Sequence, residues 1–143
     1  MHWLHDLVDY GVLGLLLLMS LIALAVAAER FLVYRALRLE AFNTRKELEL
    51  HLSNKLHLIA TIGANAPYIG LLGTVLGIML TFYDIGTVGF DTAKIMQGLA
   101  LALKATAVGL LVAIPSVALY NLLLRQSRVL LLQWDIAHER TRV

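Results

Sequence analysis

Lys104 is the residue of this sequence whose position most clearly indicates a chemical role. It lies in the stretch LALALKATAVGLLVAIPSVALYN, residues 99–121, which is otherwise almost wholly apolar. A charge at the centre of a membrane helix costs about 2.5–3.5 kcal/mol on insertion scales, so such a lysine is expected to face protein or water. A nearby acid would favour its ammonium form and burial would disfavour it, so its protonation could respond to a partner.

The common catalytic and ligand-binding motifs do not occur in the sequence. It has no cysteine, no GxxxxGK[ST] nucleotide loop, no HExxH pair and no GxSxG elbow. His51 and His57 are six residues apart, too far to share a helix face as metal ligands at i and i+4. The basic residues form no patch interleaved with aromatic residues, which argues against nucleic-acid binding. We expect no enzyme, no cofactor and no metal site, and an ion gradient as the energy source.

The elements that must position Lys104 are three apolar runs. The chain has 143 residues, of which 59% are hydrophobic and 15% charged, whereas globular proteins carry about 25% charged residues. A bilayer core of about 30 Å needs about 20 helical residues. The sequence therefore predicts a single all-α membrane domain over residues 1–143, with spans at about 10–28, 66–84 and 95–124. A cleaved signal peptide fits the first run poorly, because the residues before it are acidic.

The distribution of basic residues predicts the orientation of the spans. Residues 1–28 carry no Lys or Arg, 29–57 carry six, 84–94 carry one and 125–143 carry four. The positive-inside rule therefore places the N-terminus and the short loop at 84–94 outside, and residues 29–57 and the C-terminus inside.

The cytoplasmic segment, about 29–58, is predicted to be helical. Residues 35–42 could continue the first helix, and Thr44 and Glu47 are spaced as a capping box. An amphipathic helix over 45–58 would then lie either on the membrane surface or against a partner. The tail, 125–143, alternates apolar clusters with charges, which indicates that the third helix extends into the cytoplasm.

Counting residues along the spans predicts a polar layer. Thr74 lies ten residues, roughly 15 Å, in from Asp84, and Lys104 lies ten residues in from Lys94. Thr106 is about 3 Å deeper, so these three side chains are expected to share a layer near the midplane, whereas Thr81 is shallower. Each threonine could instead bond back to its own helix.

Small residues and a proline are expected to control helix packing. Gly70, Gly73 and Gly77 lie on one face of the second span and predict close contact, either with the third span or between subunits. Pro115 is expected to kink the third span, with neighbouring helices satisfying the carbonyl that it frees.

Two segments resemble signature segments of the ExbB/TolQ/MotA family, most closely its ExbB members. They are APYIGLLGTVLGIM, residues 66–79, and ATAVGLLVAIPSVALYN, residues 105–121, and ERF, residues 29–31, closes the first span as in the family. The resemblance implies a motor subunit of the bacterial inner membrane that forms a symmetric pentamer, surrounded by lipid, around ExbD helices. It implies use of the proton gradient to drive TonB, and pore-lining roles for Thr74 and Thr106, which would face the membrane aspartate of ExbD.

The sequence departs from the family pattern at Leu101, where a glutamate is common. Lys104 lies three residues later on a neighbouring part of the same helix face. We therefore expect the partner's aspartate to carry protons and to be the counter-ion of Lys104. The alternatives are a TolQ-like subunit of the Tol-Pal envelope system and a membrane scaffold that conducts no ions. A TonB-like partner would favour the ExbB-like reading, and a TolA-like partner would favour the TolQ-like one.

Overall fold

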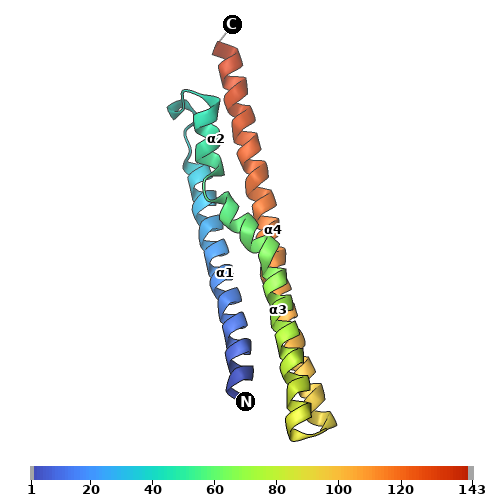
Figure 1. The fold of residues 1–143 in the computed structure, drawn as a ribbon. Helices are drawn as coiled ribbons and strands as arrows, with labels where there is room; N and C mark the ends of the chain where they lie inside the picture. Colours follow the sequence, from blue (N-terminus) through green and yellow to red (C-terminus); the bar gives the residue numbers. More distant parts are fainter. Residues whose placement is uncertain (1, 142–143) are drawn as a thin grey trace.

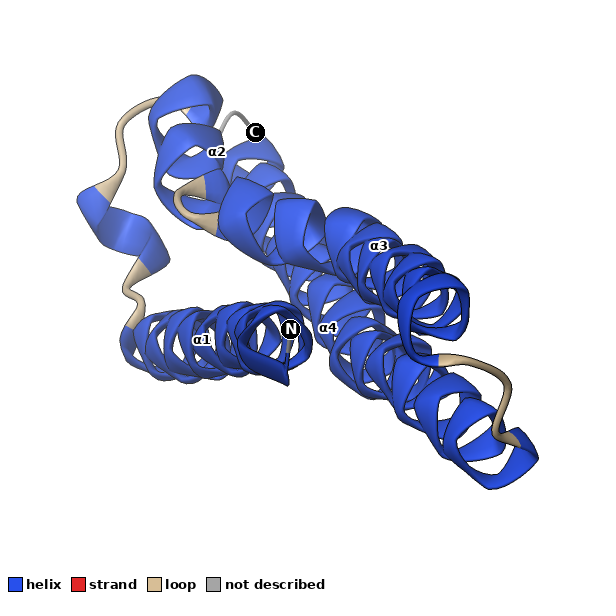
Figure 2. Ribbon diagram, turned by 60° about the horizontal axis from the view of Figure 1, so that its bottom comes forward, coloured by secondary structure: helices blue, strands red, loops and turns tan. Residues whose placement is uncertain are grey.

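The computed structural model describes residues 2–141, and these residues fold into helices and short connections with no strand among them (Figures 1 and 2). The elements are α1 (His2–Ala36), the 3-10 turn η1 (Leu39–Ala41), α2 (Arg45–Ser53), α3 (Leu56–Val88) and α4 (Thr92–Thr141). By length and composition, α1, α3 and α4 are candidate membrane spans. The predicted all-α class with three such helices is therefore confirmed.

The three long helices pack along one another, with α3 and α4 as the closest pair. These two form an antiparallel hairpin joined by a short turn, in which Gly89 has a φ of 100°. Figure 1 shows α1 beside this hairpin. The N-terminus of α1 lies toward the hairpin turn, and α2 lies near the C-terminal end of α1. We call these the turn end and the α2 end of the molecule. α4 runs as one helix through Pro115 and continues well beyond the apolar run.

The connection between α1 and α3 differs from the sequence prediction in two places. The first helix does not continue through residues 35–42: α1 ends at Ala36, and Arg38 is extended, with φ −104° and ψ 111°. This break lets Leu37, Leu39 and Phe42 fold back onto the apolar cluster at the α2 end. The helix predicted over 45–58 is also wrong in its length, because α2 ends at Ser53 and Lys55 takes a left-handed φ of 66° before α3 begins.

The start of α2 does follow its sequence signal. Thr44 is the residue before the helix, and its hydroxyl accepts a hydrogen bond from the Glu47 amide at 3.2 Å. This bond satisfies one of the amides that the first turn of a helix leaves unpaired.

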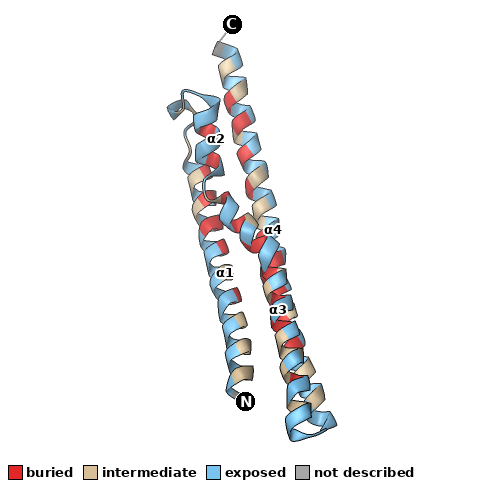
Figure 3. Cartoon of the chain, in the orientation of Figure 1, coloured by how far each residue is buried: buried red, intermediate tan, exposed pale blue. Residues whose placement is uncertain are grey.

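Buried residues, red in Figure 3, lie along the inner faces of the helices. Their apolar side chains form two clusters. The cluster at the α2 end includes Tyr34, Leu52, Ile59, Leu131 and Trp134. The second cluster lies between the long helices and contains Leu16, Ala23, Ile62, Ala66, Val112 and Ala113. The outward faces are apolar and exposed, as at Leu17, Leu111 and Ile114. Apolar surface of this extent indicates contact with lipid or with other protein chains.

Candidate ion-pathway site between the membrane helices

A line of small residues brings α3 and α4 into close backbone contact. We call it the small-residue seam, and it consists of Gly70, Gly73 and Gly77 on α3 and Ala102, Ala105 and Gly109 on α4. A Cβ atom added at Gly70 would lie 2.7 Å from the Ala105 carbonyl oxygen, and one at Gly77 would lie 2.8 Å from the Ala102 Cβ. The glycine face therefore packs the second span against the third within one chain, which was one of the two contacts that the sequence left open.

Gly73 also brings α1 to the seam. A Cβ atom added there would lie 2.8 Å from the Ala105 Cβ and 2.9 Å from a methyl carbon of Val12. All three long helices therefore meet at Gly73.

Two threonine hydroxyls lie together in the seam. Thr74 is 7% exposed, and its Oγ1 contacts the hydroxyl of Thr106 and lies 2.9 Å from the Ala102 carbonyl oxygen. The Gly70 carbonyl oxygen is 3.3 Å from Thr74 Oγ1 and 3.5 Å from Thr106 Oγ1. Each hydroxyl has one proton, so the pair has more acceptors within reach than protons to donate. Such a pair can rearrange its hydrogen bonds without moving either helix.

Thr81 does not join this pair. It is 5% exposed, and its hydroxyl donates to the Gly77 carbonyl oxygen of its own helix at 2.9 Å. Its side chain packs where Gly98 leaves room on α4. Thr81 therefore takes the own-helix bond that the sequence offered as the alternative for each threonine.

Lys104 turns away from the threonine pair toward α1. Its Nζ lies 3.3 Å from Asp9 Oδ2, with 43% of the lysine and 30% of the aspartate side chain exposed. Its counter-ion in the structure is therefore an aspartate of the same chain, whereas the sequence predicted an aspartate of a partner. Side chains on a helix lean toward its N-terminus, which for α4 is the turn end. The shared layer of Thr74, Lys104 and Thr106 near the midplane stays a prediction.

A cavity of about 80 Å³ lies between α1 and the small-residue seam, toward the turn end. Its lining combines small and apolar residues of α3 and α4, including Leu101, with polar residues of α1; the latter are His5, Asp6 and Asp9. A space of this volume holds several water molecules. Next to it, His5 Nε2 lies 2.6 Å from Asp84 Oδ2 and so links α1 to α3.

The sequence prediction missed the α1 members of this site. His5 and Asp9 are four residues apart on α1 and so point to the same side of the helix. This spacing, just ahead of an apolar run, is a signal that could have indicated contacts with the other spans.

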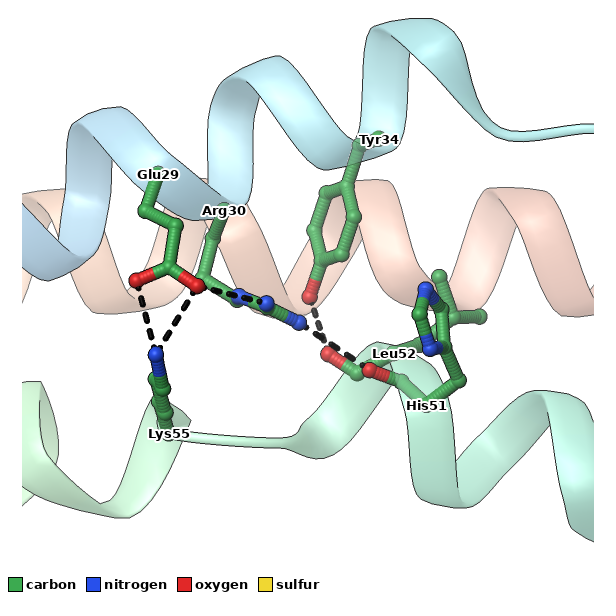
Figure 4. Close-up of polar contacts among 6 residues, drawn as sticks. All are labelled: Glu29, Arg30, Tyr34, His51, Leu52 and Lys55. Carbon is green, nitrogen blue, oxygen red and sulfur yellow. Dashed lines mark hydrogen bonds and ion pairs between the residues drawn. The ribbon is translucent and has the colours of Figure 1, made fainter.

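A second polar cluster holds the α2 end together (Figure 4). Arg30 is 4% exposed and donates to the His51 carbonyl oxygen at 3.1 Å, and the Tyr34 hydroxyl donates to the Leu52 carbonyl oxygen. These carbonyls belong to the last turn of α2, where the helix has no backbone N–H left to donate to them. A guanidinium at a helix C-terminus is also favoured by the helix dipole. The cluster therefore fixes α2 onto α1.

Lys55 completes this second cluster at the junction of α2 and α3. Its Nζ lies 2.9 Å from both carboxylate oxygens of Glu29, and Arg30 is 3.1 Å from the same carboxylate. Glu29 follows the apolar run of α1, and hydrogen bonds from Lys55 and then Arg30 lower the pKa of its carboxyl group. The left-handed backbone at Lys55 is thus held by a contact with α1.

Among residues 2–141, no group of three or more His, Asp or Glu side chains is arranged to hold a metal ion.

Comparisons with known proteins place these features in a family. Residues 23–136 match the model of the MotA/TolQ/ExbB proton channel family. Biopolymer transport protein ExbB-like 2 of Helicobacter pylori is 55% identical over 94% of this chain and 91% of that relative. Biopolymer transport protein ExbB of Aquifex aeolicus is 55% identical over 96% and 94%. Tol-Pal system protein TolQ of Pseudomonas aeruginosa is 42% identical over 69% of this chain and 42% of the relative.

Proposed function

This chain belongs to the MotA/TolQ/ExbB proton channel family, and from this premise we propose that it is the ExbB-type subunit of a proton-driven membrane motor. With ExbD-like and TonB-like partners, it uses the proton gradient to energise transport across the outer membrane. The observation that carries the proposal is 55% identity along nearly the whole chain with proteins named biopolymer transport protein ExbB or ExbB-like. The TolQ relative matches less of this chain, which favours the ExbB-type role over the TolQ-like one.

The proposed location is the bacterial inner membrane, with the turn end in the periplasm and the α2 end in the cytoplasm. The basic residues support this orientation, because ten of the twelve Lys and Arg residues lie in 29–57 and 125–143. The polar clamp of Glu29, Arg30 and Lys55 then lies at the cytoplasmic interface, and the cavity lined by Asp6 and Asp9 lies at the periplasmic one.

The proposed assembly is a symmetric homo-oligomer, a pentamer, with ExbD-like helices in a central pore. It is supported by the large exposed apolar faces of α1, α3 and α4, which a single chain leaves uncovered. Thr106 is partly exposed, so the Thr74–Thr106 pair reaches the surface of the hairpin, where a pore could contact it. The remaining apolar surface would be covered by lipid.

The proposal is tested by deleting the gene in its own bacterium and restoring it from a plasmid. Uptake of a nutrient that needs active outer-membrane transport and sensitivity to detergent are measured in the same strains, with and without a protonophore. We expect the deletion to abolish uptake, the plasmid to restore it and the protonophore to remove it again, with detergent sensitivity unchanged. Unchanged uptake with a detergent-sensitive envelope would instead support the TolQ-like role. Uptake that persists with the protonophore would indicate a scaffold.

A further inference from the structure

The ion pair between Asp9 and Lys104 joins α1 to an otherwise almost wholly apolar stretch of α4, and Asp9 also lines the turn-end cavity. His5 and Asp6 on α1 line the same cavity, and Asp84 on α3 lies 2.6 Å from His5. A carboxylate that contacts both a cation and a space large enough for water can exchange a proton with that water.

Leu101 lines the same cavity, one helical turn from Lys104. Although α4 has an apolar side chain there, the cavity still contains carboxylates, because α1 supplies them. Of these, Asp9 is in an ion pair with a cation, whereas Asp6 is exposed.

The cavity also adjoins the threonine pair of the seam. Ala102 lines the cavity, and its carbonyl oxygen accepts a hydrogen bond from the Thr74 hydroxyl at 2.9 Å. The cavity that Asp9 lines is therefore also lined by the residue whose carbonyl oxygen binds the Thr74 hydroxyl.

We propose that Asp9 is the carboxylate through which this chain exchanges protons with the outer aqueous phase, and that Lys104 is the cation that competes with the proton for it. The inference rests on the proposed function and adds the residue at which protons enter. A hydronium ion in the cavity transfers its proton to a carboxylate oxygen of Asp9 and leaves as water. The neutral acid no longer holds the ammonium of Lys104, which is then free to pair with a carboxylate on a partner helix. The proton later leaves Asp9 for water or for that carboxylate, and the ion pair forms again.

The first set of variants tests whether Asp9 does more than neutralise Lys104. Asp9→Asn removes the proton-exchanging group but retains an amide oxygen that can accept a bond from the lysine. The double variant Asp9→Asn with Lys104→Met also removes the uncompensated charge. We expect both to assemble with the ExbD-like partner, as measured by native mass spectrometry, and both to lose at least tenfold of the gradient-driven uptake. Recovery of uptake in the double variant would overturn the inference, because neither Asp9 nor Lys104 would then be required. Because Lys104→Met is itself expected to lose uptake, the role of Asp9 is judged from the single variant Asp9→Asn against the controls that follow.

Two further variants act as controls. Asp91→Asn changes an exposed acid at the turn end that does not line the cavity, and asparagine can still accept the hydrogen bond from the Ala93 amide, so uptake should stay within twofold of wild type. Asp9→Glu retains an exchangeable carboxyl group, so uptake should persist with a changed dependence on external pH. Equal losses in Asp91→Asn and Asp9→Asn, or a wild-type pH profile in Asp9→Glu, would overturn the assignment of Asp9.

A readout independent of transport separates this inference from the proposed function. Infrared difference spectra of the purified complex, recorded on acidification, should contain a carboxylic acid band that Asp9→Asn lacks and Asp91→Asn retains. If wild type shows this band but supports no gradient-driven uptake, the proposed function fails and the proton exchange at Asp9 stands. If Asp9→Asn leaves the spectrum unchanged, the inference fails whatever the uptake.

Discussion

The hydroxyl of Thr74 on α3 donates to the backbone carbonyl oxygen of Ala102 on α4 across 2.9 Å. This hydrogen bond lies in the small-residue seam, where a Cβ atom at Gly77 would already lie 2.8 Å from the Ala102 Cβ. The polar contact is possible because the two backbones approach so closely. The hairpin therefore combines close van der Waals packing with a buried hydroxyl that bridges its helices.

Thr74→Val tests how much this bridge contributes to stability. Valine has nearly the same shape but lacks the hydroxyl, so the packing is retained and the bond is lost. Hydrogen bonds between membrane helices contribute roughly 0.6 kcal/mol on average and up to about 1.7. We expect a loss within this range in reversible unfolding from mixed micelles. Thr87→Val is the control, because Thr87 is exposed and bonds only within its own helix. Equal effects of the two variants would contradict a special role for Thr74.

Gly70→Ala tests the close approach of the seam. The added methyl group would lie 2.7 Å from the Ala105 carbonyl oxygen and 3.2 Å from the Thr106 Cα, so the backbones must separate. Overpacking of this kind costs about 1–3 kcal/mol, and the unfolding free energy should fall by that amount. Gly86→Ala on the same helix has no atom within 4 Å of the new methyl group and is expected to cost nothing. A Gly70→Ala protein as stable as wild type would rule out the seam geometry.

The parts of this fold that local sequence signals control were predictable. The Thr44 cap and the glycine face of α3 follow from residue type and spacing alone. The break at Lys55 was not predictable. Lysine has no intrinsic preference for the left-handed backbone conformation, and Lys55 is held in it by an ion pair with Glu29, which is distant in sequence. The contact of the Lys104 ammonium with Asp9 was missed because counting residues gives the depth of a backbone and not the direction of a long side chain.

Arg30→Met tests the clamp at the α2 end. Methionine is apolar and unbranched but donates no hydrogen bond, so the His51 carbonyl oxygen loses its partner. This bond is part-buried, and leaving its acceptor unpaired costs about 1–3 kcal/mol, which corresponds to a rise of roughly 5- to 150-fold in the open population of α2. Digestion with a lysine-specific protease should cut at Lys46 and Lys55 faster by that factor. Arg35→Met changes an exposed arginine one turn later, and cleavage at the rate of this control would show that Arg30 does not hold α2.

Single cysteines test the proposed orientation, since the natural sequence contains none. Thr87→Cys lies near the α3–α4 turn and Asn43→Cys lies in the connection before α2. A membrane-impermeant maleimide applied to intact spheroplasts should label Thr87→Cys, and Asn43→Cys should react only after the membrane is opened. Both sites are exposed, so a difference between them reports on the membrane rather than on burial. Labelling of both from the same side would exclude three spans with this orientation.

Lys104→Met tests whether the membrane lysine acts in the motor. The Asp9–Lys104 pair is partly exposed, and ion pairs of that kind contribute no more than about 1 kcal/mol. Insertion and assembly should therefore be normal, because methionine retains the length and apolar stem of the side chain. Gradient-driven uptake should fall at least tenfold, because Asp9 would have no cation to exchange with its proton. Lys94→Met, near the start of α4 and exposed, is the matched control and should retain uptake. An assembled Lys104→Met complex with wild-type uptake would show that Lys104 has no part in the motor.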